Sequence, residues 1–182
     1  MKIKSTCLAV LALSASLAQA QWYGEIGVTP LSVKATVDGN TLKSQPTVAG
    51  VVVGYEVHPN LALEGVAVTN VDTDTISLNG SEVAGASLKV QRAFGFFIKP
   101  KVMLTPELEL FGRVGSIENR TVGQVGSLSA TQTDHDLAYG IGLNYFFNKT
   151  TYGSLGYTSF YDKNNTTTRG ATLAVGLSLI HI

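Results

Sequence analysis

The chain has 182 residues, enough for one ordinary domain, and its 13 basic and 13 acidic side chains give a formal net charge of zero. Charged residues make up only 14% of the sequence, against about a quarter in a typical soluble domain, and no basic patch or acidic tail favours nucleic-acid binding or a disordered arm. Cys7 is the only cysteine, which excludes a disulfide framework.

The first twenty residues have the pattern of a secretory signal peptide. Lys2 and Lys4 precede the apolar run Cys7–Leu17, and the small-x-small sequence Ala18-Gln19-Ala20 follows it. A bilayer-spanning helix needs about 20 apolar residues, so this run is too short to be one. We therefore predict a signal peptide at residues 1–20, cleaved before Gln21, and a single domain at residues 21–182.

The rest of the sequence alternates with a period of two, as half-buried β-strands do. In the clearest segment, large apolar residues at odd positions from Leu137 to Tyr145 alternate with Ala, Gly and Asn at even positions. The connections are alternately long and short: polar stretches occupy 35–46, 70–85, 118–134 and 161–167, and short turns lie near 58–60, 104–107 and 148–150. Strands are predicted at residues 22–34, 47–57, 61–69, 86–99, 108–117, 137–146, 151–160 and from 168 to the end.

The two faces of these segments differ in a way that favours a membrane. One face is large and apolar, and the other is mostly Gly, Ala, Ser and Asn with a few charges. A membrane barrel turns its apolar face to lipid, whereas a soluble barrel has the reverse balance. Short periplasmic turns, longer external loops and an even strand count complete the pattern. The predicted fold class is all-β: an eight-stranded antiparallel up-and-down transmembrane β-barrel with both termini in the periplasm. A soluble periplasmic barrel of the lipocalin type is the alternative.

Three short motifs carry a family resemblance. The sequence from Gly54 to Glu64 (GYEVHPNLALE), the opening Trp22–Gly24 and the segment Gly140–Tyr145 resemble the OmpA-like and OmpX-like family of small outer-membrane β-barrels. The resemblance implies the bacterial outer membrane, with lipid and lipopolysaccharide around the barrel and the barrel-assembly machinery acting during insertion. It also implies a barrel without the peptidoglycan-binding domain that follows it in OmpA. The ending Ile180–Ile182 departs from the aromatic residue with which such barrels usually finish.

A few charged side chains fall on the inward face of the predicted strands. Buried charges need partners, because an unpaired one is costly, and the resemblance implies salt bridges inside the barrel. The predicted set is therefore an interior polar network, with either a structural role or a gating role in a path for small solutes. Its members are Glu25, Glu56, Glu64, Lys99, Glu109 and Arg113.

We predict no catalytic residues, no cofactor and no metal site. His58, His135 and His181 lie on separate segments and lack the spacing of metal ligands. Arg92 falls on the lipid-facing side of its strand, and we expect a β-bulge to turn it inward, since arginine is unfavourable in lipid.

The predicted function is non-enzymatic: a structural or surface-interaction role in the outer membrane, carried by the external loops. The sequence identifies no external partner. A narrow porin-like channel for small solutes or ions is the first alternative, and a lipid-A-modifying enzyme is the second.

Overall fold

A computed structural model describes residues 22–37, 39–163 and 165–179 of the chain. The predicted signal peptide and the residues Ile180–Ile182 lie outside this part. Within it the chain forms ten antiparallel strands. They are β1 (Trp22–Val37), β2 (Asn40–Ser44), β3 (Thr47–His58), β4 (Leu61–Asp72), β5 (Asp74–Leu78), β6 (Ser81–Met103), β7 (Leu108–Val125), β8 (Leu128–Phe146), β9 (Thr151–Lys163) and β10 (Thr166–Leu179).

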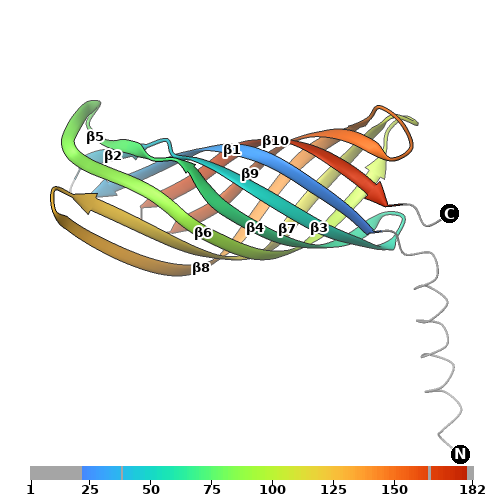
Figure 1. The fold of residues 1–182 in the computed structure, drawn as a ribbon, viewed down its shortest axis with the longest axis horizontal. Coiled ribbons are helices and arrows are strands. Elements are labelled where there is room, and N and C mark those ends of the chain that lie inside the picture. Colours follow the sequence, from blue (N-terminus) through green and yellow to red (C-terminus); the bar gives the residue numbers. More distant parts are fainter. Residues whose placement is uncertain (1–21, 38, 164, 180–182) are drawn as a thin grey trace, which may run out of the picture.

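Eight of the strands close into a ring (Figure 1). Neighbours in the sequence pair around the ring, and β10 closes it by pairing with β1 from Trp22 opposite Leu179 to Ala35 opposite Thr166. Closure pairs the two strands that would otherwise be sheet edges, which a sheet in lipid requires. The predicted all-β antiparallel barrel is therefore confirmed.

The remaining strands, β2 and β5, extend one side of the wall. β2 pairs with β1 and with β5, and β5 pairs with β6. They lie beyond the points where β3 begins at Thr47 and β4 ends at Asp72. We call this the hairpin end of the barrel; the opposite, short-turn end holds the turns at 59–60, 104–107 and 147–150, together with Trp22 and Leu179 (Figure 1).

All four long polar connections are strands for most of their length, so the expectation of loops at 35–46, 70–85, 118–134 and 161–167 was wrong. The β7–β8 hairpin, for example, stays paired as far as Val125 opposite Leu128. A hairpin that lies beyond the hydrocarbon has no need of an apolar face, so its sequence loses the alternation by which strands are recognised. Hydrogen bonds between the strands remain, and they hold these segments in the sheet.

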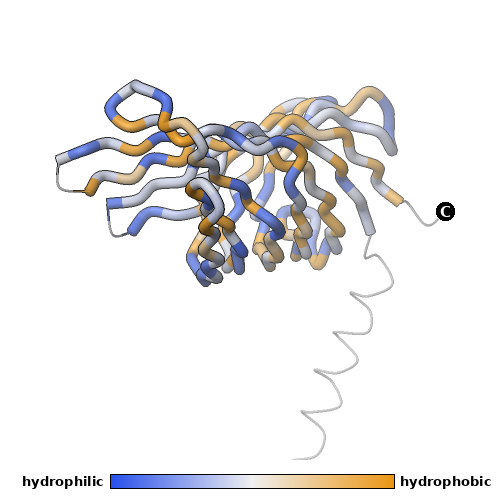
Figure 2. Tube along the Cα trace, turned by 60° about the vertical axis from the view of Figure 1, so that its left-hand side comes forward, coloured by the Kyte–Doolittle hydropathy of each residue, from blue (hydrophilic) through white to orange (hydrophobic). Residues whose placement is uncertain are grey.

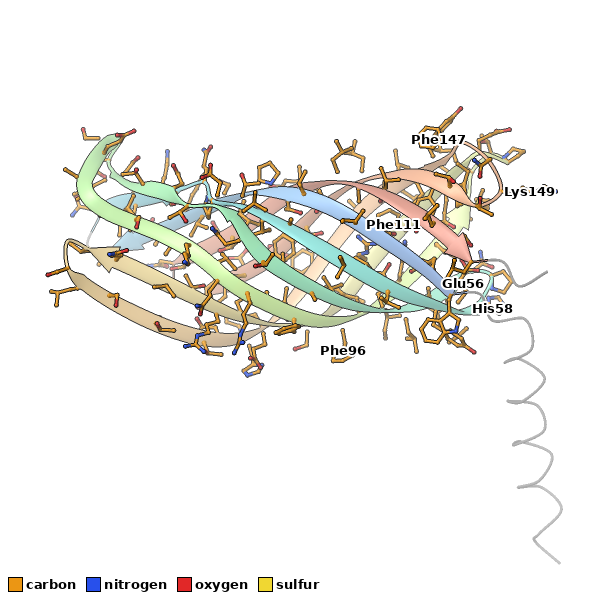
Figure 3. All side chains as sticks on the ribbon, viewed as in Figure 1. Glu56, His58, Phe96, Phe111, Phe147 and Lys149 are labelled. Atoms are coloured by element: carbon orange, nitrogen blue, oxygen red, sulfur yellow. The ribbon has the colours of Figure 1, made fainter. Side chains whose placement is uncertain are left out.

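The outward face is apolar and the inward face is not uniform. Large outward side chains such as Ile26 and Phe96 are 66% and 80% exposed, and Phe96 points away from the barrel in Figure 3. Apolar and polar residues alternate along the strands in Figure 2, as expected for a wall with one face toward lipid.

No helix in the described part of the chain is long and apolar enough to cross a bilayer.

A β-bulge interrupts β6 next to Arg92, the residue that strict alternation places on the lipid-facing side. The pairing with β7 shifts between Val90 and Arg92, so Gln91 is the extra residue. Gln91 and Arg92 are both exposed, whereas Val90 and Ala93 on either side are buried. The expectation that a bulge turns Arg92 inward was wrong: the extra residue instead turns Val90 inward, together with Leu88, which lines the interior.

Candidate functional site

The structure brings the six predicted interior charges into the half of the lumen near the short-turn end. They form two groups. The inner cluster consists of Glu25, Glu64, Lys99 and Arg113, and the rim cluster, closer to the turns, consists of Glu56, Lys101, Glu109 and Asn144. Figure 3 places Glu56 at this end, near His58 and the start of β1.

The inner cluster is a closed set of ion pairs. The Lys99 ammonium lies 3.1 Å from Glu25 Oε1 and 3.2 Å from Glu64 Oε1. The Arg113 guanidinium donates to Glu64 through Nε (2.6 Å) and Nη2 (2.9 Å), and Nη2 also donates to Glu25 Oε2 at 2.7 Å. Two cations thus meet two carboxylates, and the bidentate geometry of arginine fixes their orientation.

Aromatic side chains surround this cluster. The hydroxyl of Tyr23 donates to Glu64 Oε1 at 2.7 Å, and that of Tyr152 donates to Glu25 Oε1 at 3.0 Å. The Lys99 ammonium lies 4.8 Å from the centre of the Tyr23 ring and 4.5 Å from that of Phe111, within the range of cation–π attraction. The lumen at this level is therefore filled by charges, hydroxyls and rings, with Lys99 only 1% exposed.

Two glycines make room for these rings. Gly54 lies opposite Tyr23 on the neighbouring strand, and Gly176 lies opposite Tyr152. A Cβ atom at either glycine would overlap the tyrosine ring. The small inward residues in the sequence are thus partners of large inward rings from the adjacent strands.

The rim cluster continues the plug toward the turns. Lys101 pairs with Glu56 and lies 3.1 Å from Glu109 Oε2, and Asn144 Nδ2 donates to Glu109 Oε1 at 2.8 Å. Across both clusters, three cations face four carboxylates, a net charge of 3 − 4 = −1. Every carboxylate has a cationic partner, as buried charges require.

Sequence reasoning missed four members of this site. Lys101 shares its face with Lys99 two residues earlier, but the strand was predicted to end at residue 99. Tyr23 shares its face with Glu25 in the same way, but the predicted network contained only charged side chains and so left out Tyr23, Tyr152 and Asn144. In each case the period-two alternation of the strand already indicated that the side chain faces inward.

The half of the lumen near the hairpin end holds a cavity of about 460 Å³. Its floor is the inner cluster, with Glu25 and Arg113 among the lining residues. Above that floor the wall is largely apolar, so the expectation of a small and polar interior holds only for part of the barrel. The apolar lining includes Leu31, Val48, Val66, Val68, Leu88, Val90, Phe97, Ile117 and Phe160.

Polar groups return at the mouth of this cavity, where Asn119, Thr121, Gln132 and Thr168 line the wall. Nearby, Lys163 of β9 pairs with Asp136 of β8. The hydrogen bond from Lys163 to this carboxylate and their charge attraction raise the pKa of Lys163 above its ordinary value. No group of three His, Cys, Asp or Glu side chains suited to a metal ion occurs in the described residues.

The arrangement can seal and stiffen the barrel, and it can enclose an apolar guest. General acid–base chemistry needs a carboxyl group or imidazole beside a reacting atom, whereas the inner carboxylates are already engaged by Lys99 and Arg113. His58 and His135 lie on β3 and β8, toward opposite ends of the barrel.

Solved structures of small outer-membrane proteins share this architecture. Ail of Yersinia pestis, solved in complex with the heparin analogue sucrose octasulfate, is 16% identical with a TM-score of 0.64, over 88% of this chain and 99% of that one. Neisserial surface protein A is 13% identical (TM-score 0.59; 88% and 97% covered). The N-terminal barrel of Pseudomonas aeruginosa OprF is 16% identical (TM-score 0.60; 88% and 100% covered). At these identities the likeness is one of fold.

A comparison of the sequence with curated proteins finds no match. The family described as outer membrane protein beta-barrel domain, however, matches residues 5–179, which is nearly the whole chain and includes every strand described above. The predicted resemblance and the bacterial outer-membrane location agree with this match. The chain therefore belongs to the outer membrane protein β-barrel domain family.

Proposed function

We propose that this chain is a non-enzymatic outer-membrane protein that presents its hairpin end to the outside of the cell and interacts there with other proteins. Both termini then lie in the periplasm, lipid and lipopolysaccharide surround the apolar outward face, and the barrel-assembly machinery inserts the chain. The long hairpins support this orientation, because outer-membrane barrels have short periplasmic turns and longer external connections.

The single observation that carries the interaction is a free strand edge at the hairpin end. β8 pairs with β9 only from Tyr139 to Phe146, whereas its pairing with β7 continues outward to Leu128. Among the described strands, none pairs with the other side of β8 between Leu128 and Ala138. Such an edge offers backbone donors and acceptors to an added strand.

The charges at this end favour such a partner over a polyanion. Ail was solved with a sulfated heparin analogue, but among the described residues of this chain the charges toward the hairpin end balance at seven basic and seven acidic residues. A polysulfated glycan would meet no net positive field. The residues are Lys34, Lys43, Lys89, Arg92, Arg120, Lys163 and Arg169 against Asp72, Asp74, Glu82, Glu118, Asp134, Asp136 and Asp162.

Cysteine labelling of intact bacteria tests the orientation. The described residues contain no cysteine, so a single introduced thiol reports its own side of the membrane. We expect Ser127→Cys, at the tip of the β7–β8 hairpin, to react with a membrane-impermeant maleimide on intact cells. The control Lys149→Cys, in a short turn, should react only after the outer membrane is permeabilised. The reverse pattern would refute the orientation.

Peptide selection tests the interaction. A phage-displayed random peptide library is panned on the barrel in lipid nanodiscs, and the bound peptides are mapped by backbone hydrogen exchange. We expect slowed exchange from Leu128 to Leu137, and loss of binding when residues 121–132 are replaced by Asn-Gly, which shortens the hairpin between paired residues. Peptides that still bind the shortened barrel, or a library without binders, would contradict the proposal.

A further inference from the structure

We propose that the apolar cavity binds a single-chain amphiphile, with an unbranched hydrocarbon chain inside the barrel and the polar end at the mouth near the hairpins. This ligand site is separate from the β8 edge. It requires neither a protein partner nor a particular orientation of the barrel in the membrane.

The cavity persists because the wall cannot collapse onto it. Strand number and stagger fix the diameter of a barrel, and backbone pairing joins each strand of the ring to both neighbours, although the β8–β9 pairing ends at Tyr139 on the side of the cavity. Small inward residues such as Gly27, Gly50 and Ala174 line the space without filling it. The volume of about 460 Å³ lies in the range of small-molecule sites, and apolar cavities tend to exclude water and to accept apolar guests.

Apolar side chains form two clusters in the lining of the cavity. Leu31, Val48 and Val90 form a buried apolar cluster in the wall, with Val68 and Phe160 packed against it. Phe97 and Ile117 belong to a second apolar cluster, which Val68 and Phe160 also contact. Thr29, Thr158 and Thr172 also line the cavity, and the hydroxyl groups of Thr29 and Thr172 hydrogen-bond to each other at 2.8 Å. A hydrocarbon chain would therefore contact mostly apolar atoms, each buried methylene adding to the affinity.

The two ends of the cavity fix the direction of the chain. At the floor, Glu64 and Glu25 already bind Nε and Nη2 of Arg113, so a polar head placed there would meet a neutralised cluster and lose its hydration. At the mouth, Thr121, Gln132 and Thr168 offer hydrogen bonds, and Lys43 and Asp134 supply one charge of each sign. The ligand consequently enters tail first, and its head remains in water.

Methyl NMR in lipid nanodiscs tests this site with dodecanoate as the probe. The barrel carries labelled Ile, Leu and Val methyl groups, and the lipids are deuterated so that protein–probe contacts stand out. We expect saturable shifts at Leu31, Val68 and Val90, with cross-relaxation to the protons of the probe. The methyl groups of Val51 and Leu63 are exposed on the outward face and report on probe dissolved in the bilayer. Their chemical shifts should change without saturating.

Two substitutions at one cavity position separate volume from polarity. Val68→Phe, which places a ring in the cavity, should weaken binding at least tenfold, and Val68→Thr, which keeps the volume but adds a hydroxyl, should weaken it severalfold. Ala67→Phe, on the adjacent outward position of β4, is the matched control and should bind like the parent. Heat-modifiable migration verifies that each variant forms a barrel. Shortening the probe to hexanoate should weaken binding roughly threefold or more for each methylene removed.

Three results would overturn the proposal. The first is a response at Val68 and Val90 that grows linearly, as at the outward methyl groups. The second is undiminished binding by Val68→Phe. The third is cross-relaxation from protonated lipid to the cavity methyl groups before any probe is added, which would make a bilayer lipid the occupant. A probe that carries a nitroxide near its carboxylate tests the direction of binding. It should broaden the NMR signals of Thr121 and Thr168 at the mouth, whereas broadening of the Phe97 signals instead would refute tail-first binding.

Discussion

Lys99 is buried in the half of the lumen near the short-turn end, with two carboxylates and two aromatic rings around its ammonium group. Desolvation of such a charge is costly, and only the surrounding partners offset it. The cluster is neutral as a set, because Lys99 and Arg113 face Glu25 and Glu64. Its contribution therefore depends on charge balance within the set as much as on any single pair.

Removing one cation from this set should be strongly destabilising. Lys99→Met leaves two carboxylates with Arg113 alone, and we expect a loss of about 3–5 kcal/mol in the free energy of unfolding, as for other broken buried pairs. Urea titration in lipid vesicles measures it. The double variant Lys99→Met/Glu25→Gln restores neutrality and should recover a large part of the loss. Additive effects in this double-mutant cycle would contradict the idea of a neutral set.

The glycines opposite the buried tyrosines give a second prediction at this scale. A methyl group at Gly176 would overlap the Tyr152 ring, so Gly176→Ala should cost about 1–3 kcal/mol through overpacking. Gly65→Ala is the matched control, because a Cβ there meets no atom within 4 Å. The same urea titration compares them, and equal stability of the two variants would show that the ring moves aside freely.

At the scale of elements, the bulge in β6 decides which side chains enter the lumen. Strict alternation continued from the regular half of the strand, beyond Ala93, places Lys89 and Gln91 inside. The one extra residue reverses the parity beyond it, so Leu88 and Val90 line the cavity instead. No local composition signal marks this position, because a bulge is selected by the pairing of whole strands.

Deleting the extra residue should therefore be tolerated. Without Gln91, Val90 still faces Thr121 and Arg92 still faces Arg120, and every other side chain keeps its side of the wall. We expect the deletion variant to form a heat-modifiable barrel. Deletion of Phe96, in the regular part of the same strand, would send half of β6 to the wrong face and should abolish the barrel. Failure of the Gln91 deletion alone would mean that the bulge has a further role.

The strands themselves were predictable to different degrees. The membrane-facing segments, such as 137–146, were recognised because lipid demands an apolar residue at every second position. The hairpin extensions were not recognised, because β2 (Asn40–Ser44) and β5 (Asp74–Leu78) lie beyond that demand and their pairing depends on partners distant in the sequence. Alternation thus predicts the part of a barrel that touches lipid.

At the scale of the whole molecule, the same rule explains what the sequence predicted about the site. Charges such as Glu64 and Arg113 stand out among small inward residues, so six of the seven charges of the two clusters could be recognised from the sequence, and only Lys101 was missed. Their division into two clusters was not, because it depends on the stagger between strands. The cavity was not predicted either, since it results from the bulge and from the packing of eight strands together.

The two clusters should make the intact barrel electrically silent. Charged groups, hydroxyls and rings fill the lumen between the turns and Arg113, and eight strands leave little space beyond their side chains. We expect no stable single-channel steps from the parent protein in planar bilayers. Arg113→Ala removes the largest side chain of the inner cluster and leaves Lys99 with two carboxylates, so it should either introduce a small cation-selective conductance or leave the bilayer silent.

The direction in which Arg113→Ala changes the conductance distinguishes a plug from a gated path. If Arg113 formed part of a conducting route, the parent protein would conduct and Arg113→Ala would reduce the current, whereas a plug can only leak when it is truncated. Arg169→Ala is the control, because Arg169 pairs with Asp162 at the exposed hairpin end and lies outside both clusters. A parent conductance that disappears in Arg113→Ala and persists in Arg169→Ala would establish the channel and overturn the plug.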